Sequence, residues 1–136
     1  METHYKKILI ATDGSENSEN AISRGIDLAK MSDAKVYAIY VLDTGAYFNH
    51  PVFEKEEAKK YTTDRVEEIG NERGVKVESV ILIGNPADDI IDFAKKNDVD
   101  LIVMGSLGKS GVERFLLGSV SDKVLKHAYS EVLVVP

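Results

Sequence analysis

The sequence predicts an α/β fold, a single-domain, open and doubly wound parallel sheet with helices on both faces. Along the 136 residues, five short apolar runs are separated by segments with the periodicity of amphipathic helices. The runs are continuous rather than alternating, as strands covered on both faces require. Hydrophobic residues make up 43% of the chain and charged residues 29%, a balance typical of globular domains. We therefore expect one domain over residues 1–136.

The apolar runs give the predicted strands, which lie at residues 7–12, 36–42, 75–83, 101–104 and 132–135. β-Branched and aromatic residues, which favour strands, are frequent in the second run. Because a helical segment follows each of the first four strands, we expect parallel pairing through right-handed crossovers.

Local signals mark the ends of the predicted helices. Helices are expected at about residues 16–31, 54–73 and 119–128, and from residue 85 onward. Asp13-Gly14-Ser15 forms a turn and cap before the first helix, and Gly74 is a stop for the second. Asn85 is expected as an N-cap, followed by Pro86 in the first turn.

Composition argues against several classes of protein. The net charge of −6 disfavours a nucleic-acid surface, which needs a basic face. The chain has no cysteine, and therefore no disulfide or thiolate metal site. The histidines, His4, His50 and His127, lack metal-ligand spacing. No apolar run approaches the ~20 residues of a membrane span and no signal-peptide core is visible, so we expect a cytoplasmic protein without a membrane partner.

A glycine-rich segment between the fourth strand and the last helix is the clearest functional signal. Gly105 and Gly108 are followed, after nine residues, by Gly118 and Ser119. Glycines let backbone N–H groups approach an anion, and the following helix N-terminus adds partial positive charge. The sequence therefore predicts a phosphate site, to which Lys109 could add a point charge. The Ser119 hydroxyl could also cap the helix, in addition to binding phosphate. Alternatively, the glycines only shape a loop and Lys109 is solvated.

The same segment imitates the end of a P-loop but is not one. Gly108-Lys109-Ser110 matches the last residues of the Walker A motif. That motif also requires a glycine at position 103, where this chain has Val103. We therefore exclude a P-loop nucleotide hydrolase.

Three segments carry a resemblance to a known family. They are Ile8-Leu9-Ile10-Ala11-Thr12-Asp13-Gly14-Ser15, Asp100-Leu101-Ile102-Val103-Met104-Gly105-Ser106-Leu107-Gly108, and Leu117-Gly118-Ser119-Val120-Ser121 with the closing Val132-Leu133-Val134-Val135-Pro136. With them, essentially the whole chain resembles the ATP-binding branch of the universal stress protein family, whose Gly-x2-Gly-x9-Gly-Ser/Thr motif is met in full. The resemblance implies the strand order 3-2-1-4-5. Ligands in such sheets bind where the order reverses, between the first and fourth strands.

The resemblance also implies which residues line a nucleotide site. The set is Ala11, Thr12, Asp13, Val41, Met104, Gly105, Ser106, Gly108, Lys109, Gly118, Ser119, Val120 and Ser121. Asp13 would bind ribose or adenine groups, or help to hold Mg²⁺ through water. The backbone of Val41 would contact adenine and Met104 would form an adenine wall, although both are otherwise expected in the core. Ala11 replaces the proline common in the family, and it is also small.

The function that the resemblance implies is ATP binding with Mg²⁺ by a stress-response regulator. ADP or AMP are alternatives, because glycine amides bind a phosphate group whatever the number of phosphates on the nucleotide. A homodimer is implied through residues 132–135, an apolar edge strand in the implied order. The stretch 43–53 is expected to be a crossover loop, or one that folds over a ligand or a partner.

The alternative function is a slow or partner-activated ATP hydrolase. Asp13 and Glu113 are the candidates for orienting water, and Arg114 is the candidate arginine finger. Neither carboxylate is obviously placed as a base, so the sequence favours binding over turnover. Adenylating enzymes are disfavoured because their Ser-Gly-Gly loop is replaced here by Thr12-Asp13-Gly14-Ser15. A family branch that does not bind nucleotide is disfavoured because this chain keeps the glycine motif.

Overall fold

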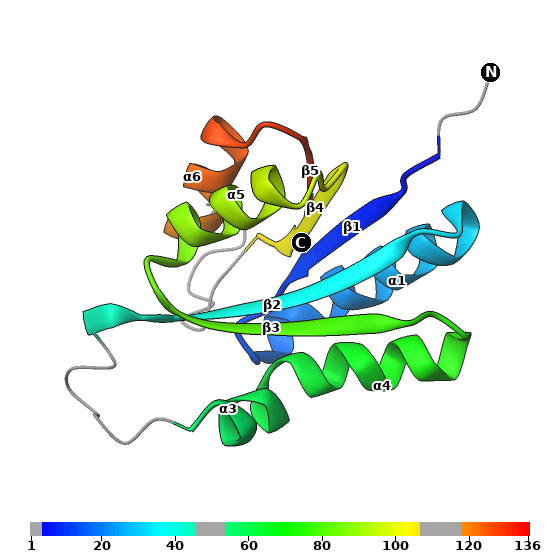
Figure 1. Cartoon of the computed structure of the whole chain (residues 1–136), viewed down its shortest axis with the longest axis horizontal. Helices are drawn as coiled ribbons and strands as arrows, with labels where there is room; N and C mark the ends of the chain where they lie inside the picture. The colour runs from blue at the N-terminus through cyan, green and yellow to red at the C-terminus, as the bar shows by residue number, and fades with distance from the viewer. Residues whose placement is uncertain (1–3, 46–53, 107–117) are drawn as a thin grey trace.

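The structure, a computed structural model, describes residues 4–45, 54–106 and 118–136. Five strands form one parallel sheet in the order β3-β2-β1-β4-β5 (Figure 1). They are β1 (Lys7–Ala11), β2 (Lys35–Asp43), β3 (Val77–Gly84), β4 (Leu101–Gly105) and β5 (Glu131–Val135). The predicted fold class and strand order are therefore confirmed.

Strand β1 lies at the centre of the sheet, and the strand order reverses beside it. Ile8 is paired with Val36 of β2 on one side and with Leu101 of β4 on the other. Because all these pairings are parallel, the carboxyl ends of β1, β2 and β4 share one edge of the sheet. Ala11 and Gly105 end β1 and β4 at that edge.

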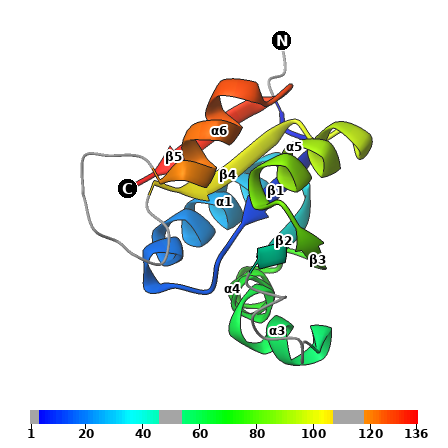
Figure 2. The ribbon, with the colours of Figure 1, turned by 90° about the vertical axis from the view of Figure 1, so that its left-hand side faces the viewer.

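Helices cover both faces of the sheet, with α1 and α4 on one face and α5 and α6 on the other (Figures 1 and 2). The helical elements whose bounds fall within the described residues are η1 (Glu16–Ser18), α1 (Glu19–Ser32), α3 (Lys55–Tyr61), α4 (Thr63–Arg73), α5 (Pro86–Lys96) and α6 (Ser119–His127). None of the helices in the described residues is long and apolar enough to cross a membrane.

The alternation of side chains along β1 divides the core into two layers. Ile8 and Ile10 pack with α1 and α4, whereas Leu9 and Ala11 pack with α5 and α6. Ile8, Leu9 and Ile10 are fully buried. Both faces of β1 are therefore apolar, which explains the continuous run in the sequence.

The segment predicted as one helix at residues 54–73 is instead two helices, α3 and α4. The helical conformation is interrupted at Thr62, where φ is −131° and ψ is −90°. The Thr62 hydroxyl donates to the Ala58 carbonyl at 2.7 Å, and side-chain bonds of this kind bend helices. None of the residues of α3 is buried, whereas α4 buries Val66 and Ile69. The break thus lets α4 follow the sheet while α3 lies exposed.

Several predicted element ends are confirmed. Asn85 is the N-cap of α5, and its side chain accepts from the backbone N–H of Asp88 at 3.1 Å. Gly74 ends α4 with a φ of 74°, and the Val75 N–H donates to Gly70 O at 2.8 Å. Because Val75 belongs to this helix end, β3 begins at Val77, two residues later than predicted.

Candidate functional site

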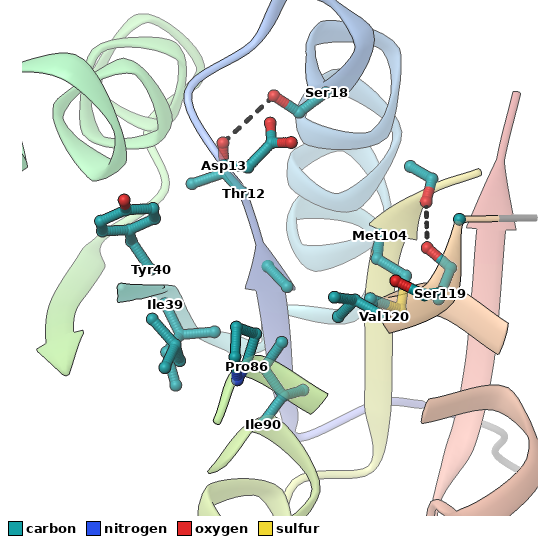
Figure 3. Close-up of a pocket in the computed structure, with 15 residues that line it drawn as sticks. Thr12, Asp13, Ser18, Ile39, Tyr40, Pro86, Ile90, Met104, Ser119 and Val120 are labelled. Atoms are coloured by element: carbon teal, nitrogen blue, oxygen red, sulfur yellow. Dashed lines mark hydrogen bonds between the residues drawn. The ribbon is translucent and has the colours of Figure 1, made fainter. Parts of the chain in front are cut away.

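A cavity of about 340 Å³ opens at the carboxyl ends of the central strands (Figure 3). Its lining comes from β1, β2 and β4, from the turn after β1 with the end of η1, and from the starts of α5 and α6. The residues are Ala11, Thr12, Asp13, Ser18, Ile39, Tyr40, Val41, Pro86, Ile90, Met104, Gly105, Gly118, Ser119, Val120 and Ser121. The cavity lies where the strand order reverses, as expected for a ligand site in an open α/β sheet.

Thr12, Asp13 and Ser18 line one end of the cavity, and we call the turn that carries them, residues 12–18, the β1 end. The Thr12 N–H donates to Ile39 O at 3.0 Å and so extends the strand pairing by one residue. The Thr12 Oγ1 accepts from the Gly14 N–H at 3.1 Å and lies 3.1 Å from Ser18 Oγ. The Ser18 hydroxyl donates to Ser15 O at 2.7 Å. These bonds hold the turn between β1 and η1.

Asp13 is the only charged residue among the described residues that line the cavity. Its Oδ1 accepts from both the backbone N–H and the hydroxyl of Ser15, at 3.0 and 2.6 Å. An aspartate that bonds two residues ahead is a common turn element. The Asp-Gly-Ser signal therefore forms the predicted turn, and it also fixes a carboxylate at the cavity.

Gly14 completes the β1 end in a conformation that other residues rarely adopt. Its φ is +80°, in the left-handed region. A Cβ atom at this position would lie 2.2 Å from Tyr61 O at the end of α3. The turn that carries Asp13 is thus packed directly against the break between α3 and α4.

Apolar side chains form a second part of the lining. Figure 3 shows Ile39, Pro86 and Ile90 together on one side of the cavity, away from Ser119 and Val120. Val41 and Met104 are buried, with 7% and 4% of their surface exposed. A flat apolar group such as a base would be accommodated between these side chains.

A third part of the lining comes from Gly105 and residues 118–121, which together with Ser106 behind them we call the α6 end. The Gly118 N–H donates to Ser106 O at 2.7 Å, and the Ser121 hydroxyl donates to Gly105 O at 2.6 Å. These bonds fix the start of α6 beside the end of β4. As in any helix, the first N–H groups of α6 have no acceptor within the helix, so they can bind an anion.

The N-cap of α6 is Gly118, with a φ of −64° and a ψ of 156°, and no side chain caps the helix. The expectation that Ser119 also caps the helix is therefore wrong. Ser119 is the first residue of α6 instead. Because Ser121 is committed to the Gly105 carbonyl, Ser119 supplies the hydroxyl at this helix start that has no hydrogen bond within the described residues.

The structure brings most of the predicted site residues together at this cavity. Those that line it are Ala11, Thr12, Asp13, Val41, Met104, Gly105, Gly118, Ser119, Val120 and Ser121. Ser106 contributes its backbone carbonyl to the α6 end without lining the cavity. Gly108 and Lys109, and the hydrolase candidates Glu113 and Arg114, lie outside the described residues.

Five lining residues were not predicted: Ser18, Ile39, Tyr40, Pro86 and Ile90. The signal for two of them was present, because Pro86 follows the third strand and Ile90 lies one helical turn later. Parallel strand ends share an edge, so the start of α5 had to lie near the cavity. For Ser18 the sequence offers no signal.

Electrostatically, the cavity has one negative side chain at the β1 end and a helix N-terminus at the α6 end. Burial, and to a lesser extent the charge of Asp13, raise the pKa of Tyr40 above its ordinary value. Tyr40 is therefore a neutral phenol at physiological pH. Within the described residues, no group of three or more His, Cys, Asp or Glu side chains could hold a metal ion.

The chain is similar to known proteins along almost its whole length. Residues 4–136 match the model of the Universal stress protein family. A universal stress protein of Methanocaldococcus jannaschii is 45% identical over 143 residues, which cover 98% of this chain and 84% of that protein.

Two solved structures of this family resemble the whole chain. The universal stress protein from Archaeoglobus fulgidus in complex with dAMP is 27% identical, with a TM-score of 0.76 over 98% of this chain and 100% of that one. A universal stress protein in complex with cAMP is 25% identical, with a TM-score of 0.76 over 98% of each chain. From its sequence match and its fold, the chain belongs to the universal stress protein family.

Proposed function

We propose that this protein binds ATP with Mg²⁺ at the carboxyl ends of β1 and β4 and acts in the cytoplasm as a stress-response regulator. One observation carries the proposal. A single cavity joins an apolar wall, a carboxylate and a helix N-terminus, which suit the base, the sugar and the phosphates of a nucleotide, in that order. ADP or AMP could occupy the same cavity.

The adenine is assigned to the apolar side. Ile39, Pro86 and Ile90 offer a surface on which a planar base can be buried. The backbone of Val41, near the end of β2, supplies hydrogen-bonding groups for the edge of the base. Met104 closes the wall from β4.

The phosphates are assigned to the α6 end. Gly118 lets the ligand approach the backbone, and the N–H groups of Ser119 and Val120 provide donors at the positive end of the helix. The Ser119 hydroxyl adds a further donor. Gly108 and Lys109 are expected to complete this cradle from the segment between β4 and α6.

Mg²⁺ is assigned to the phosphates, with Asp13 holding it through water. A magnesium ion keeps several waters and usually takes few protein ligands, so one carboxylate suffices. The residues present therefore fit the ion, since Asp13 lines the cavity. When bound, Mg²⁺ would neutralise phosphate charge.

The relatives support an adenine nucleotide. Two family structures are complexes with cAMP and with dAMP. Both ligands combine an adenine with one phosphate group, the two parts assigned to the two sides of the cavity. The choice of ATP and Mg²⁺ rests on the glycine motif and on Asp13.

Binding without rapid hydrolysis is the favoured form of this function. Phosphoryl transfer needs an oriented water and cationic groups at the transferred phosphate. Among the described lining residues, Asp13 is the sole carboxylate, and none is a lysine or arginine. A nucleotide would thus persist in the site and act as a signal.

Titration calorimetry with ATP, ADP, AMP and adenosine, each with and without Mg²⁺, tests the proposal on protein stripped of nucleotide. We expect ATP to bind most tightly in Mg²⁺ and affinity to fall as phosphates are removed. Equal affinity for adenosine and ATP would contradict the assignment of the α6 end. Absence of binding by all of them would overturn the proposed function.

We also propose a homodimer that forms through β5. Within the described residues, β5 pairs only with β4, so its other edge is open. Residues 132–135 are apolar and only partly buried. An open apolar edge favours pairing with a second copy. Sedimentation should give twice the chain mass of 15.0 kDa, and a monomer at all concentrations would contradict the proposal.

A further inference from the structure

The hydroxyl groups around Asp13 are nearly all committed within the protein. Thr12 Oγ1 is engaged by the Gly14 N–H and by Ser18, each at 3.1 Å. Because Ser18 Oγ donates to Ser15 O at 2.7 Å, the Thr12 hydroxyl is left to donate to Ser18. Neither hydroxyl therefore has a free proton for a ligand.

Asp13 differs, since only one of its two carboxylate oxygens is used. Oδ1 accepts two hydrogen bonds from Ser15, at 3.0 Å from the backbone N–H and at 2.6 Å from the hydroxyl. Within the residues that the structure describes, Oδ2 has no hydrogen-bond partner. An ionised carboxylate oxygen can only accept, so its partner in a complex must be a donor.

Two donors on one oxygen fix the direction of the whole group. The backbone N–H alone would leave the carboxylate free to turn about its bond to Cβ, because terminal torsions of this type are broad. The Ser15 hydroxyl bond is short and charge-assisted, and it removes that freedom. Oδ2 is then left for the cavity that Asp13 lines.

We propose that Ser15 is a positioning residue of the nucleotide site, which orients Asp13 so that Oδ2 accepts a hydrogen bond from a donor on the ligand. The inference rests on the proposed function, since it needs a nucleotide in the cavity. The donor is a sugar hydroxyl or a water on the magnesium ion. Ser15 itself does not line the cavity and acts through Asp13.

The orientation also selects which part of the nucleotide meets Asp13. A phosphate oxygen carries negative charge and no proton, so a fixed Oδ2 repels it. At the α6 end the helix N-terminus attracts phosphate instead. Ser15 therefore helps to place the sugar, with or without hydrated Mg²⁺, at the β1 end.

A double-mutant cycle on the full chain tests this, with ATP affinity measured by calorimetry in Mg²⁺. Ser15→Ala should weaken binding about tenfold, as expected for a lost charge-assisted bond. Asp13→Ala should weaken it more. In the double variant Ser15→Ala should add nothing, because no carboxylate remains to be positioned.

Two further variants separate positioning from general damage. Ser15→Thr keeps a hydroxyl, and the extended backbone at Ser15, with φ −82° and ψ 162°, suits a β-branched residue. It should restore most of the affinity. Ser23→Ala removes a hydroxyl of α1 that accepts from Arg73 at 3.0 Å and does not line the cavity, so it should leave binding unchanged.

The outcomes are distinguishable. If the parent binds ATP and Ser15→Ala binds it equally well, this inference is overturned and the proposed function stands. The inference would also be overturned if the double variant lost ATP affinity by the product of the two single losses, because Ser15→Ala and Asp13→Ala would then act independently. If the parent does not bind any adenine nucleotide, both proposals fail.

Repeating the cycle with AMP in EDTA assigns the donor on the ligand. If Ser15→Ala still weakens binding, the donor is the sugar, and if it no longer does, the donor is a water on Mg²⁺. Either result supports positioning by Ser15.

Discussion

At the β1 end of the cavity the polar groups belong to side chains that hydrogen-bond to one another, whereas at the α6 end they are mainly the backbone N–H groups of a helix start. Thr12, Asp13, Ser15 and Ser18 bond to one another around a single turn. The α6 end depends on a helix start without a side-chain cap and on one hydroxyl, that of Ser121. The β1 end should therefore respond to the loss of single hydroxyls, and the α6 end to any side chain that covers its amides.

Gly14→Ala should have the largest effect, because it breaks the β1 end itself. The new Cβ would lie 2.2 Å from Tyr61 O in a residue with a φ of +80°. We expect the free energy of unfolding to fall by roughly 3 kcal/mol, from backbone strain and overlap together. Denaturant unfolding measures it.

Gly74→Ala is the matched control for that variant. Gly74 has a similar φ of +74°, but apart from its own neighbours in the chain no atom of the described residues lies within 4 Å of its Cβ position. It should lose only about 1 kcal/mol from the left-handed backbone. Equal losses in the two variants would show that the contact between the Asp13 turn and Tyr61 is unimportant.

Gly118→Val tests the α6 end and should act on binding rather than on folding. The backbone at Gly118, with φ −64° and ψ 156°, is allowed for any residue. We expect ATP affinity to fall at least about tenfold because the side chain covers the helix amides. The free energy of unfolding should change by about 0.5 kcal/mol or less.

Adenosine serves as the control ligand for Gly118→Val, since it has no phosphate. Calorimetry should give nearly the same adenosine affinity for the parent and the variant. A variant that binds ATP as well as the parent does would show that the glycine segment is not the phosphate site.

Two serines allow the ends of the cavity to be compared directly. Ser18 and Ser121 are each 5% exposed and each donates to a backbone carbonyl. Ser18→Ala also leaves the buried Thr12 hydroxyl without its acceptor, so it should cost about 2 kcal/mol of unfolding free energy against about 1 kcal/mol for Ser121→Ala. Denaturant unfolding of both variants checks the order, and a larger loss for Ser121→Ala would reverse the comparison.

The sequence predicted the sheet because its signal is local and repeated. Each run such as residues 7–12 is apolar on both faces, and alternation with helices leaves few topologies. The strand order came from the family resemblance. The break at Thr62 was not predicted, because the charged residues on both sides of it continue a helical pattern. The break depends on contacts between distant segments, such as that of Tyr61 with Gly14, which the sequence pattern does not contain.

The site was predicted where it depends on glycines and strand ends, and missed where it depends on packing between elements. Gly118 and Asp13 carry signals in their own neighbourhood. Ile39 and Tyr40 lie in an ordinary strand, and their place in the lining follows only from the twist and pairing of β2. The hydrogen bonds between Ser15 and Asp13 were not predicted either, because the sequence pattern does not fix the side-chain rotamers of these residues.

The smallest expected effect concerns Tyr40, which reports how far the charge of the β1 end reaches. Its pKa is raised by burial and then by Asp13, so the unfolded chain releases this proton at a lower pH than the folded protein does. The contribution of neutral Tyr40 to the free energy of unfolding is therefore intact below the ordinary pKa of 10.0, and it is lost as pH rises through the pKa of the folded protein. Tyr40→Phe should flatten the alkaline loss of stability, measured by unfolding between about pH 8 and 11.

Tyr5 provides the contrast that makes this measurement specific. Burial and Glu131 raise its pKa as well, at a position that does not line the cavity. Asp13→Asn should therefore reduce the part of the alkaline slope that Tyr40→Phe removes, and leave the part that Tyr5→Phe removes unchanged. If Asp13→Asn alters neither part, burial alone sets the Tyr40 pKa. The field of the fixed carboxylate would then be confined to its own turn, and its influence on a ligand would require direct contact.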